Sequence, residues 1–342
     1  MKLRELAQSL GLSVTTVSRA LGGYPEVSEQ TRAIVREAAD RLGYVPNPIA
    51  QKLVSGRSGM VGLITLRPVQ AATDPSFTET ILGLSSCLTA HDIDLILRVG
   101  IEDDVVEPYR RLAAKGALDA FILNAPSPND PRIAYLRAQK IAFVVHGRDC
   151  DAPDYAFYDI DNYQVGVDSA EYLVSLGHRR IAMLNGPEGF SFARERLRGF
   201  RDVMAAHGLT VPDGYVHHAA SDEYYGYAAT SAMMTGQTAP IPTAIICAST
   251  LTATGVLRAL ADRNIAVPKE ISVMAHDDGL PDHRPARMKP TLTVTHLPMR
   301  EACQPLADMV VGLLDGAPLE KLQTTVMAEL IVRGSTGPVR AP

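Results

Sequence analysis

The chain has 342 residues and a net charge of −5, with 46% hydrophobic and 21% charged residues. This length exceeds that of one ordinary domain and favours a small module joined to a larger, two-lobed one. The sequence contains no run of about 18 apolar residues, and its start, Met1-Lys2-Leu3-Arg4-Glu5, lacks the apolar segment of a signal peptide. These features argue against a membrane or secreted protein, and we expect a cytoplasmic one.

The charge is unevenly distributed along the chain. Up to Arg57 there are eight basic and five acidic residues, a net charge of +3, which leaves −8 for the remainder. A modestly basic head on an acidic body is compatible with an N-terminal module that binds nucleic acid.

The four cysteines, Cys87, Cys150, Cys247 and Cys303, are widely spaced, with neither a Cys-x-x-Cys pair nor a cluster with histidine. This spacing signals neither a metal site nor a disulfide framework. We therefore expect buried free thiols, no metal and no cofactor.

The first 42 residues have the pattern of three helices. Residues 3–10 carry apolar side chains at helical spacing, and Gly11 can end this helix in the left-handed conformation. Ser13 can cap a short second helix at 14–21, and Ser28 can cap a third. In the second helix Val17 and Leu21 share the face that packs on the other helices. The opposite face stays available to an outside partner.

After Pro46-Asn47-Pro48, residues 49–55 form a brief amphipathic run that is typical of a linker with helical potential. Apolar, strand-like runs then alternate with amphipathic helical segments. The runs are VGLITL (61–66), DLILRV (94–99), DAFILN (119–124), IAFVVH (141–146), RIAMLN (180–185), TAIICA (243–248) and ISVMAH (271–276). Strands that are apolar on both faces and separated by helices predict parallel sheets covered on both sides. There are enough strands for two sheets, and ligands of such sheets bind at the carboxyl ends of the strands, so the expected site is a cleft between two lobes.

With these segments in order, the chain resembles the LacI/GalR family of bacterial transcription regulators over essentially its whole length. The matching segments include "LRELAQSLGLSVTTVSRALGGYPEVSEQTR", "AADRLGYVPNPIAQKLVSGRSGMVGLI", "LVSLGHRRIAMLNGP", "ARERLRGF", "GVLRALADRNIAVPKEISVMAHDD" and "ELIVRGST". The "HGRD" and "YDIDN" segments resemble regulators of α-glucoside uptake within the family.

The resemblance implies an all-α helix-turn-helix head and an α/β, periplasmic-binding-protein-like core of two parallel-sheet subdomains. The expected divisions are a DNA-binding domain at 1–45, a hinge helix and linker at 46–58, and a ligand-sensing and dimerisation core at 59–342. Within the core, the N-subdomain would comprise about 59–160 and 294–320, and the C-subdomain about 161–293 and 321–335. The implied function is repression of carbohydrate uptake or catabolism genes by a homodimer on a pseudo-palindromic operator, with release by a sugar effector.

The resemblance also implies which residues meet DNA. Val14, Thr15 and Arg19 would read base edges in the major groove, although Arg19 could pair with a phosphate instead of a guanine. Ser13, Thr16 and Ser18 would contact phosphates. Alternatively, Ser13 only caps the second helix and does not contact phosphate. In the hinge, Leu53, with Ala50 beside it, would wedge into the minor groove, or Leu53 would simply pack on the core.

The candidate effector contacts lie at strand ends and in loops. They are Phe77, Asn124, His146, Arg148, Arg196, Ser249, Asp277 and His296. By resemblance Asp277 grips ligand hydroxyls, with Asp278 as its neighbour, and Arg196 is the ligand-binding arginine. The retained arginine and aspartate favour a neutral polyol.

Several cleft positions depart from the family. Ala248-Ser249-Thr250 stands where Ala-Asn-Asp is frequent, and His146-Gly147-Arg148 stands where an Asp-Arg pair is common. For His146, His276 and His296, a structural role competes with ligand contact.

An enzyme could use the same scaffold, but the chain lacks a G-x-S-x-G elbow, a phosphate-binding G-x-x-x-x-G-K-[ST] loop and a clean G-x-G-x-x-G after a strand. A secreted binding protein would share the two lobes but not the head. Within the regulators, a purine or phosphoprotein corepressor is the alternative to a sugar inducer, and the sign of control stays open. Two operator half-sites and no leucine-heptad tail predict a dimer.

Overall fold

The computed structural model describes residues 3–22, 24, 26–44, 57–65, 75–100, 104–237 and 239–339. The chain divides into two compact units, Met1–Gly59 and Met60–Pro342. This division lies beside the boundary expected between the linker and the core. Each unit has its own hydrophobic core.

The described residues of the first unit form the helices α1 (Leu3–Ser9), α2 (Val14–Leu21) and α3 (Glu29–Arg41). Gly11 has φ +65°, a conformation in which glycine is favoured, and it turns the chain between α1 and α2. Ser13 and Ser28 cap the next two helices, because their side chains accept hydrogen bonds from backbone N–H groups three residues on. The predicted all-α head and both serine caps are confirmed.

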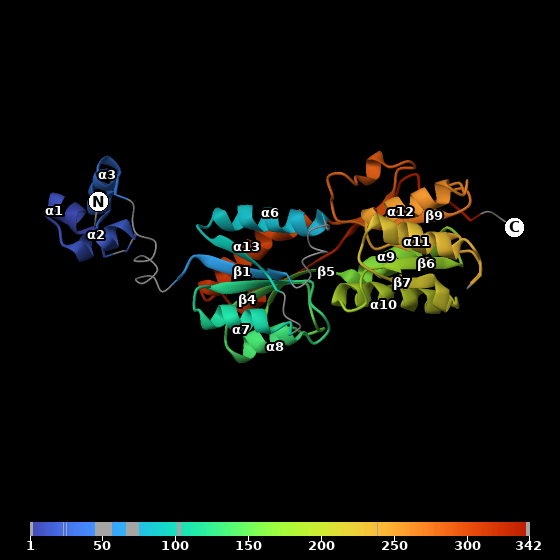
Figure 1. Ribbon diagram of the computed structural model, residues 1–342, viewed down its shortest axis with the longest axis horizontal. Helices are drawn as coiled ribbons and strands as arrows, with labels where there is room; N and C mark the ends of the chain where they lie inside the picture. The colour runs from blue at the N-terminus through green and yellow to red at the C-terminus, as the bar shows by residue number, and fades with distance from the viewer. Residues whose placement is uncertain are drawn as a thin grey trace. The chain divides into compact units, whose positions relative to one another are not determined.

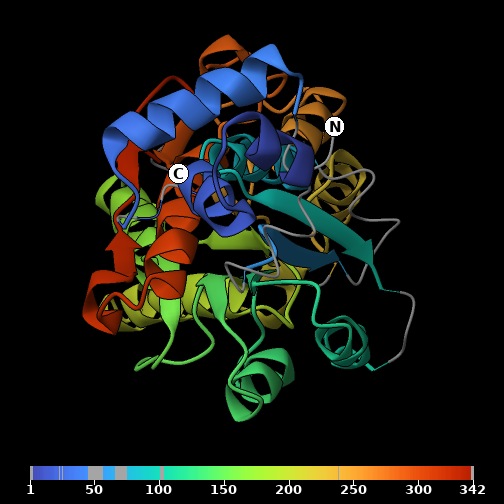
Figure 2. The ribbon, with the colours of Figure 1, turned by 90° about the vertical axis from the view of Figure 1, so that its left-hand side faces the viewer.

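The second unit contains two six-stranded sheets, which define an N-subdomain and a C-subdomain (Figure 1). The N-subdomain sheet has the order β11-β5-β4-β3-β1-β2, with every neighbouring pair parallel. Its strands are β1 (Met60–Thr65), β2 (Asp94–Val99), β3 (Ala120–Asn124), β4 (Phe143–His146), β5 (Ala156–Ile160) and β11 (Gln323–Val326). The strand β2, teal in Figure 2, lies at an edge of this sheet.

Helices cover both faces of the N-subdomain sheet. On one face α6 (Pro75–Thr89) and α13 (Cys303–Leu314) supply buried side chains such as Leu84 and Leu306. On the other, α7 (Glu107–Ala114) and α8 (Pro131–Ala138) supply Tyr109 and Leu136. Two short 3-10 helices, η3 (Met299–Ala302) and η4 (Leu319–Lys321), flank α13.

The C-subdomain sheet has the order β12-β10-β9-β8-β6-β7, and only β12 runs antiparallel, against β10. Its strands are β6 (Ile181–Asn185), β7 (Val216–His218), β8 (Ala244–Cys247), β9 (Ser272–Asp277), β10 (Thr293–His296) and β12 (Glu329–Ile331). One face is covered by α9 (Asn162–Ser175) and α10 (Ser191–Ala206), and the other by α11 (Glu223–Met233) and α12 (Thr250–Ala261). The 3-10 helices η1 (Asp213–Tyr215) and η2 (Pro285–Arg287) lie in loops.

The expected subdomain boundaries near the C-terminus need correction. We expected 294–320 in the N-subdomain, but β10 pairs with β9 and β12 in the C-subdomain. We expected 321–335 in the C-subdomain, but β11 pairs with β5 in the N-subdomain. Both strands adjoin a crossing between the sheets, and strand pairing rather than local sequence decides the sheet to which each belongs.

Three chain segments cross between the subdomains: β5 to α9, β10 to α13, and β11 to β12. Apolar side chains from all three form one small cluster, in which Ile160, Val165 and Leu297 are buried and Val326 and Ala328 pack against them. The two subdomains are therefore joined through a shared hydrophobic contact at the crossing.

The four cysteines are free thiols, as predicted, but only Cys247 and Cys303 are buried and Cys150 is exposed. Among the described ranges, no helix combines the length and the apolar character that crossing a bilayer requires.

Candidate functional site

The helix α2 of the first unit separates a buried face from an exposed one. Val17 and Ala20 are fully buried against α1 and α3. On the other side Val14 is 41% exposed, and Thr15 and Arg19 are exposed as well. The three predicted base-reading side chains therefore share an outward face of one helix.

The predicted phosphate contacts are less uniform. Ser13 accepts from the Thr16 backbone N–H at 3.0 Å, and its Oγ lies 2.8 Å from Thr16 Oγ1. The cap role of Ser13 is thus present, and contact with phosphate stays a prediction. Ser18 is half-buried. Ala50 and Leu53 lie outside the described residues.

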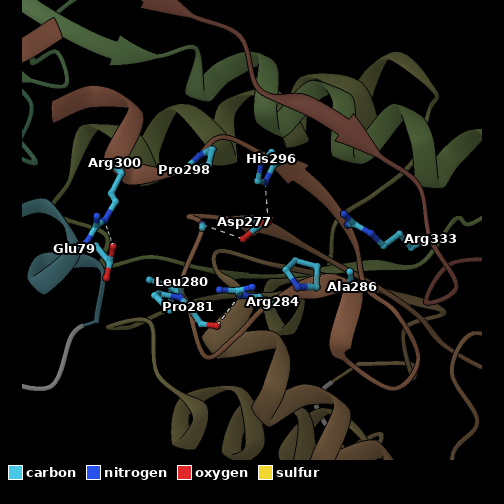
Figure 3. A pocket seen from close by; sticks show the side chains of 12 residues that line it. Glu79, Asp277, Leu280, Pro281, Arg284, Ala286, His296, Pro298, Arg300 and Arg333 are labelled. Carbon is cyan, nitrogen blue, oxygen red and sulfur yellow. Dashed lines mark hydrogen bonds and ion pairs between the residues drawn. The ribbon is translucent and has the colours of Figure 1, made fainter. Parts of the chain in front are cut away.

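A pocket of about 580 Å³ opens beside the carboxyl ends of β9 and β10 (Figure 3). Residues of both subdomains line it: Glu79, Asp277, Gly279, Leu280, Pro281, Arg284, Pro285, Ala286, His296, Pro298, Arg300 and Arg333. Glu79, on α6, pairs with Arg300, on η3. Of the predicted effector contacts, Asp277 and His296 lie here.

Asp277 and His296 form a close pair across the two neighbouring strands. Their Oδ2 and Nδ1 atoms are 2.7 Å apart, and the Gly279 backbone N–H donates to Asp277 Oδ1 at 3.0 Å. Asp277 is 3% exposed, whereas the His296 side chain is about one-third exposed. In this pair a buried carboxylate of fixed position contacts an imidazole that is more accessible to solvent.

A second group of polar side chains runs from one subdomain to the other. Arg148 Nε donates to Asp159 Oδ2 at 2.7 Å, and Asp159 Oδ1 lies 3.4 Å from Asn162 Nδ2. Asn162 Oδ1 accepts from Arg196 Nε at 2.9 Å. Since Arg148 and Asp159 belong to the N-subdomain and Arg196 to α10, this chain of contacts joins two predicted effector residues across the first crossing segment.

Burial dominates the electrostatics of this group. It lowers the pKa of the Arg196 guanidinium, and the carboxylates of Asp278 and Asp159 oppose that shift. It raises the pKa of Asp159, against the effect of the neighbouring Arg148. Arg196 Nη1 also donates to the Ala248 carbonyl at 3.0 Å, so the buried charge is held by hydrogen bonds as well as by acids.

Two buried histidines stand at strand ends, one in each subdomain. Burial lowers the pKa of His146 to about 4, and its Nδ1 has no hydrogen-bond partner among the described residues. His276 Nδ1 lies 3.1 Å from Thr295 Oγ1 on β10, and its Nε2 lies 3.5 Å from Asp278 Oδ1. Burial also lowers the pKa of His276. His276 thus makes a cross-strand contact through Nδ1, and both histidines keep one ring nitrogen without a hydrogen bond among the described residues.

The remaining predicted contacts have more local partners. Asn124 is half-buried and lies beside His146 in the register of β3 and β4. Ser249 is buried, and its Oγ caps α12 by accepting from the Thr252 N–H at 3.2 Å. Phe77 packs against the N-subdomain core.

Sequence reasoning missed residues that complete the site. They are Glu79, Asp159, Asn162, Arg284, Arg300 and Arg333. Asp159 lies near the end of a buried strand, AFYDI, that was not recognised, and Asn162 follows that strand. A polar residue at or after the end of a buried strand is the signal that would have found both.

Comparisons with known proteins agree with this geometry. The description "Bacterial regulatory proteins, lacI family" matches residues 2–47, and "Periplasmic binding protein-like domain" matches residues 170–336. The HTH-type transcriptional regulator AglR of Rhizobium meliloti (strain 1021) is 41% identical over 341 residues, which cover 99% of this chain and 95% of that protein. RafR of Escherichia coli is 33% identical and covers 95% of each.

Solved structures share the fold over nearly the whole chain. The transcriptional regulator CelR in complex with cellobiose has a TM-score of 0.71 at 26% identity, and covers 98% of this chain and 99% of that one. The lac repressor dimer bound to operator and the anti-inducer ONPF has a TM-score of 0.81 at 23% identity with the same coverage. The chain therefore belongs to the LacI family of bacterial transcriptional regulators.

Proposed function

We propose that this regulator is a cytoplasmic, non-enzymatic homodimer whose head binds a pseudo-palindromic operator and whose core binds a sugar that weakens operator binding. The observation that carries the proposal is the set of polar contacts from Arg148 to Arg196, which brings binding groups of both subdomains to one place. A ligand that contacts both subdomains favours one spacing between them and can thereby change the equilibrium of the whole protein.

The chemistry of the site suits a neutral, hydroxyl-rich ligand. Asp277 offers a carboxylate that accepts from hydroxyls, Arg196 offers N–H donors, and His146 offers a neutral ring nitrogen. We assign Phe77, Asn124, Ser249 and His296 to the lining of the same cleft. Two relatives support a sugar: CelR is solved with cellobiose, and the ribose operon repressor of Escherichia coli is 27% identical over 97% of this chain.

In the head we assign base contacts to Val14, Thr15 and Arg19, which share the exposed face of α2. Val14 suits a thymine methyl, and Arg19 suits a guanine edge. Phosphate contacts fall to Ser13, Thr16 and Ser18. The hinge roles of Ala50 and Leu53 remain part of the proposal.

A dimer interface is proposed on the edge of the N-subdomain. Leu97 and Val99 on the edge strand β2 are 43% and 46% exposed, and Leu82 on the adjacent α6 is 56% exposed. Exposed apolar side chains on an edge strand invite pairing with another chain. We propose that a second copy of this chain covers this surface, because an operator with two-fold symmetry is bound by a two-fold dimer.

The test is fluorescence anisotropy of a labelled operator taken from the DNA upstream of neighbouring transport or glycosidase genes, at fixed salt. The sugars are maltose, sucrose, trehalose, cellobiose and ribose. We expect one of them to weaken operator binding by about ten-fold or more, a coupling of about 1.4 kcal/mol. Strengthened binding would instead identify a corepressor, and the absence of any palindromic binding site would refute operator recognition.

A further inference from the structure

The guanidinium of Arg196 is fixed in one orientation. Nε donates to Asn162 Oδ1 at 2.9 Å, Nη1 donates to the Ala248 carbonyl at 3.0 Å, and the guanidinium carbon lies 5.4 Å from the centre of the Phe192 ring. Because the guanidinium is planar, two hydrogen bonds along adjacent edges determine the direction of its third nitrogen. The hydrogen bonds that fix the guanidinium use Nε and Nη1, so Nη2, whose direction they determine, is the donor that we assign to the ligand.

The residue that holds Arg196 is itself held. Asn162 is 6% exposed, and its Nδ2 donates to the Ile160 carbonyl at 3.0 Å and lies 3.4 Å from Asp159 Oδ1. These contacts orient the amide so that its oxygen, and not its nitrogen, faces Arg196. An alanine or a reversed amide at this position would leave Arg196 Nε buried without an acceptor.

Asp159 links the contacts of Asn162 and Arg196 to the N-subdomain. It is 8% exposed, and its Oδ2 accepts from Arg148 Nε at 2.7 Å while its Oδ1 faces Asn162. Arg148 also lies over the Phe157 ring, at 5.6 Å from the ring centre. One carboxylate and one amide, three residues apart, therefore hold two arginines that come from different subdomains.

We propose that Asn162 and Asp159 are positioning residues of the effector site, with Asn162 acting through Arg196 and Asp159 acting through Arg148. The inference rests on the proposed sugar-binding function and goes beyond it by assigning roles to two side chains that line no part of the pocket. Preorganisation is the physical basis: an arginine already held in its binding geometry loses less side-chain freedom when the ligand arrives. Both positioning residues lie at the first crossing segment, so a change in subdomain spacing alters the two arginines together.

The test combines sugar binding with two double-mutant cycles. Isothermal titration calorimetry of the full-length protein uses whichever of maltose, sucrose, trehalose, cellobiose and ribose changes operator binding most. We expect Asn162→Ala to raise the sugar Kd by about ten-fold. In the Arg196→Ala background the same change should have no further effect, because a residue that acts only through Arg196 has nothing left to position.

Asp159→Asn provides the second cycle, with Arg148→Ala as its partner. It keeps the volume of the buried side chain and so remains informative if Asn162→Ala does not fold. We expect a several-fold rise in the sugar Kd that disappears in the Arg148→Ala background. Gln164→Ala is the matched control, since Gln164 on the same helix bonds to Asp168 and not to either arginine. Its sugar Kd should equal that of the wild type.

The outcomes separate this inference from the function on which it rests. If no sugar changes operator binding, the proposed function fails and the inference fails with it. If a sugar acts and Arg196→Ala weakens it, but the Asn162 and Asp159 variants bind it as the wild type does, only the positioning role is refuted. If the Asn162 and Asp159 substitutions raise the sugar Kd by the same factor with the arginine present and with it replaced by alanine, they cause a general structural defect. That result would also refute the positioning role.

Discussion

His296 Nδ1 lies 2.7 Å from Asp277 Oδ2 and joins the carboxyl ends of β10 and β9. The chain leaves β10 at His296 to cross into the N-subdomain, so the pair stands where the pocket meets a crossing segment. The second oxygen of Asp277 is held by the Gly279 N–H. Any ligand that contacts this carboxylate therefore contacts a group whose position is tied to the crossing.

Replacement of Asp277 by asparagine tests its part in effector binding. The change keeps an oxygen for the Gly279 N–H but removes the charge that strengthens hydrogen bonds to ligand hydroxyls. We expect the sugar Kd to rise by about ten-fold or more, with operator affinity unchanged in the absence of sugar. Calorimetry and anisotropy measure the two quantities. Asp282→Asn, an exposed change in the following loop, is the control, and a wild-type sugar response in Asp277→Asn contradicts the assignment.

Replacement of Arg19, on the exposed face of α2, by alanine is the sharpest test of base recognition by the head. Loss of a bidentate arginine–guanine contact costs about 1–3 kcal/mol, so we expect Arg19→Ala to weaken operator binding by that amount and non-specific DNA binding much less. Arg36→Ala removes the same charge from an exposed position on α3 and serves as the control. Equal losses in the two variants on specific and non-specific DNA would reassign Arg19 to general electrostatic attraction.

The head could be predicted nearly residue by residue because its signals are local. Ser13, Ser28 and Gly11 each act within one helical turn, and a cap or a left-handed glycine can be recognised from its immediate neighbours. The alternation of strands and helices likewise predicted two layered sheets. The short strands β10 and β11 were assigned to the wrong subdomains because a four-residue strand carries no local sign of its pairing partner.

The site could be predicted only in part, because some of its residues meet through packing between segments that are distant in the sequence. Arg196 and Asp277 were found through motifs, and the structure places both beside polar partners. Their holders were not found: Asn162 meets Arg196 across 34 residues of sequence, and only the packing of α9 on α10 brings them together. Ser249 shows a related limit: its ligand contact stays a prediction, and its sequence position did not reveal that its hydroxyl caps α12.

Gly166 tests how closely that helix packing controls the site. A Cβ at this position would lie 2.1 Å from the Arg196 carbonyl oxygen, so α9 and α10 must separate to admit it. We expect Gly166→Ala to lower the free energy of unfolding by about 1–3 kcal/mol, as overpacking generally does, and to weaken sugar binding through displacement of Arg196. Urea denaturation and calorimetry measure the effects. Gly189→Ala, where the added Cβ meets nothing within 4 Å, should match the wild type, and unchanged stability in Gly166→Ala would refute the close-packing argument.

Leu97→Glu tests the proposed dimer surface on β2. A charged side chain at a buried contact between two copies is costly to desolvate, so we expect sedimentation equilibrium to show a shift toward monomer and operator binding to weaken with it. Met327→Glu places the same charge at a residue that is 58% exposed in the segment between β11 and β12 and is the control. If Leu97→Glu stays dimeric, the two copies meet elsewhere.

His146 should make the stability of the core depend on pH. Burial holds its pKa at about 4, below the ordinary value of 6.5, so between these values the unfolded chain binds a proton that the folded chain does not. The contribution is fully present above pH 6.5 and is lost as pH falls toward 4. At about 1.4 kcal/mol per pH unit this contribution to the free energy of unfolding amounts to about 3 kcal/mol. Burial also lowers the pKa of His276 and of His178, so these residues add to the same pH dependence.

We therefore expect the urea midpoint of the wild type to fall from pH 7 to pH 4.5, and that of His146→Gln to fall less. Equal slopes in His146→Gln and the wild type would show that His146 is protonated without cost in the folded state.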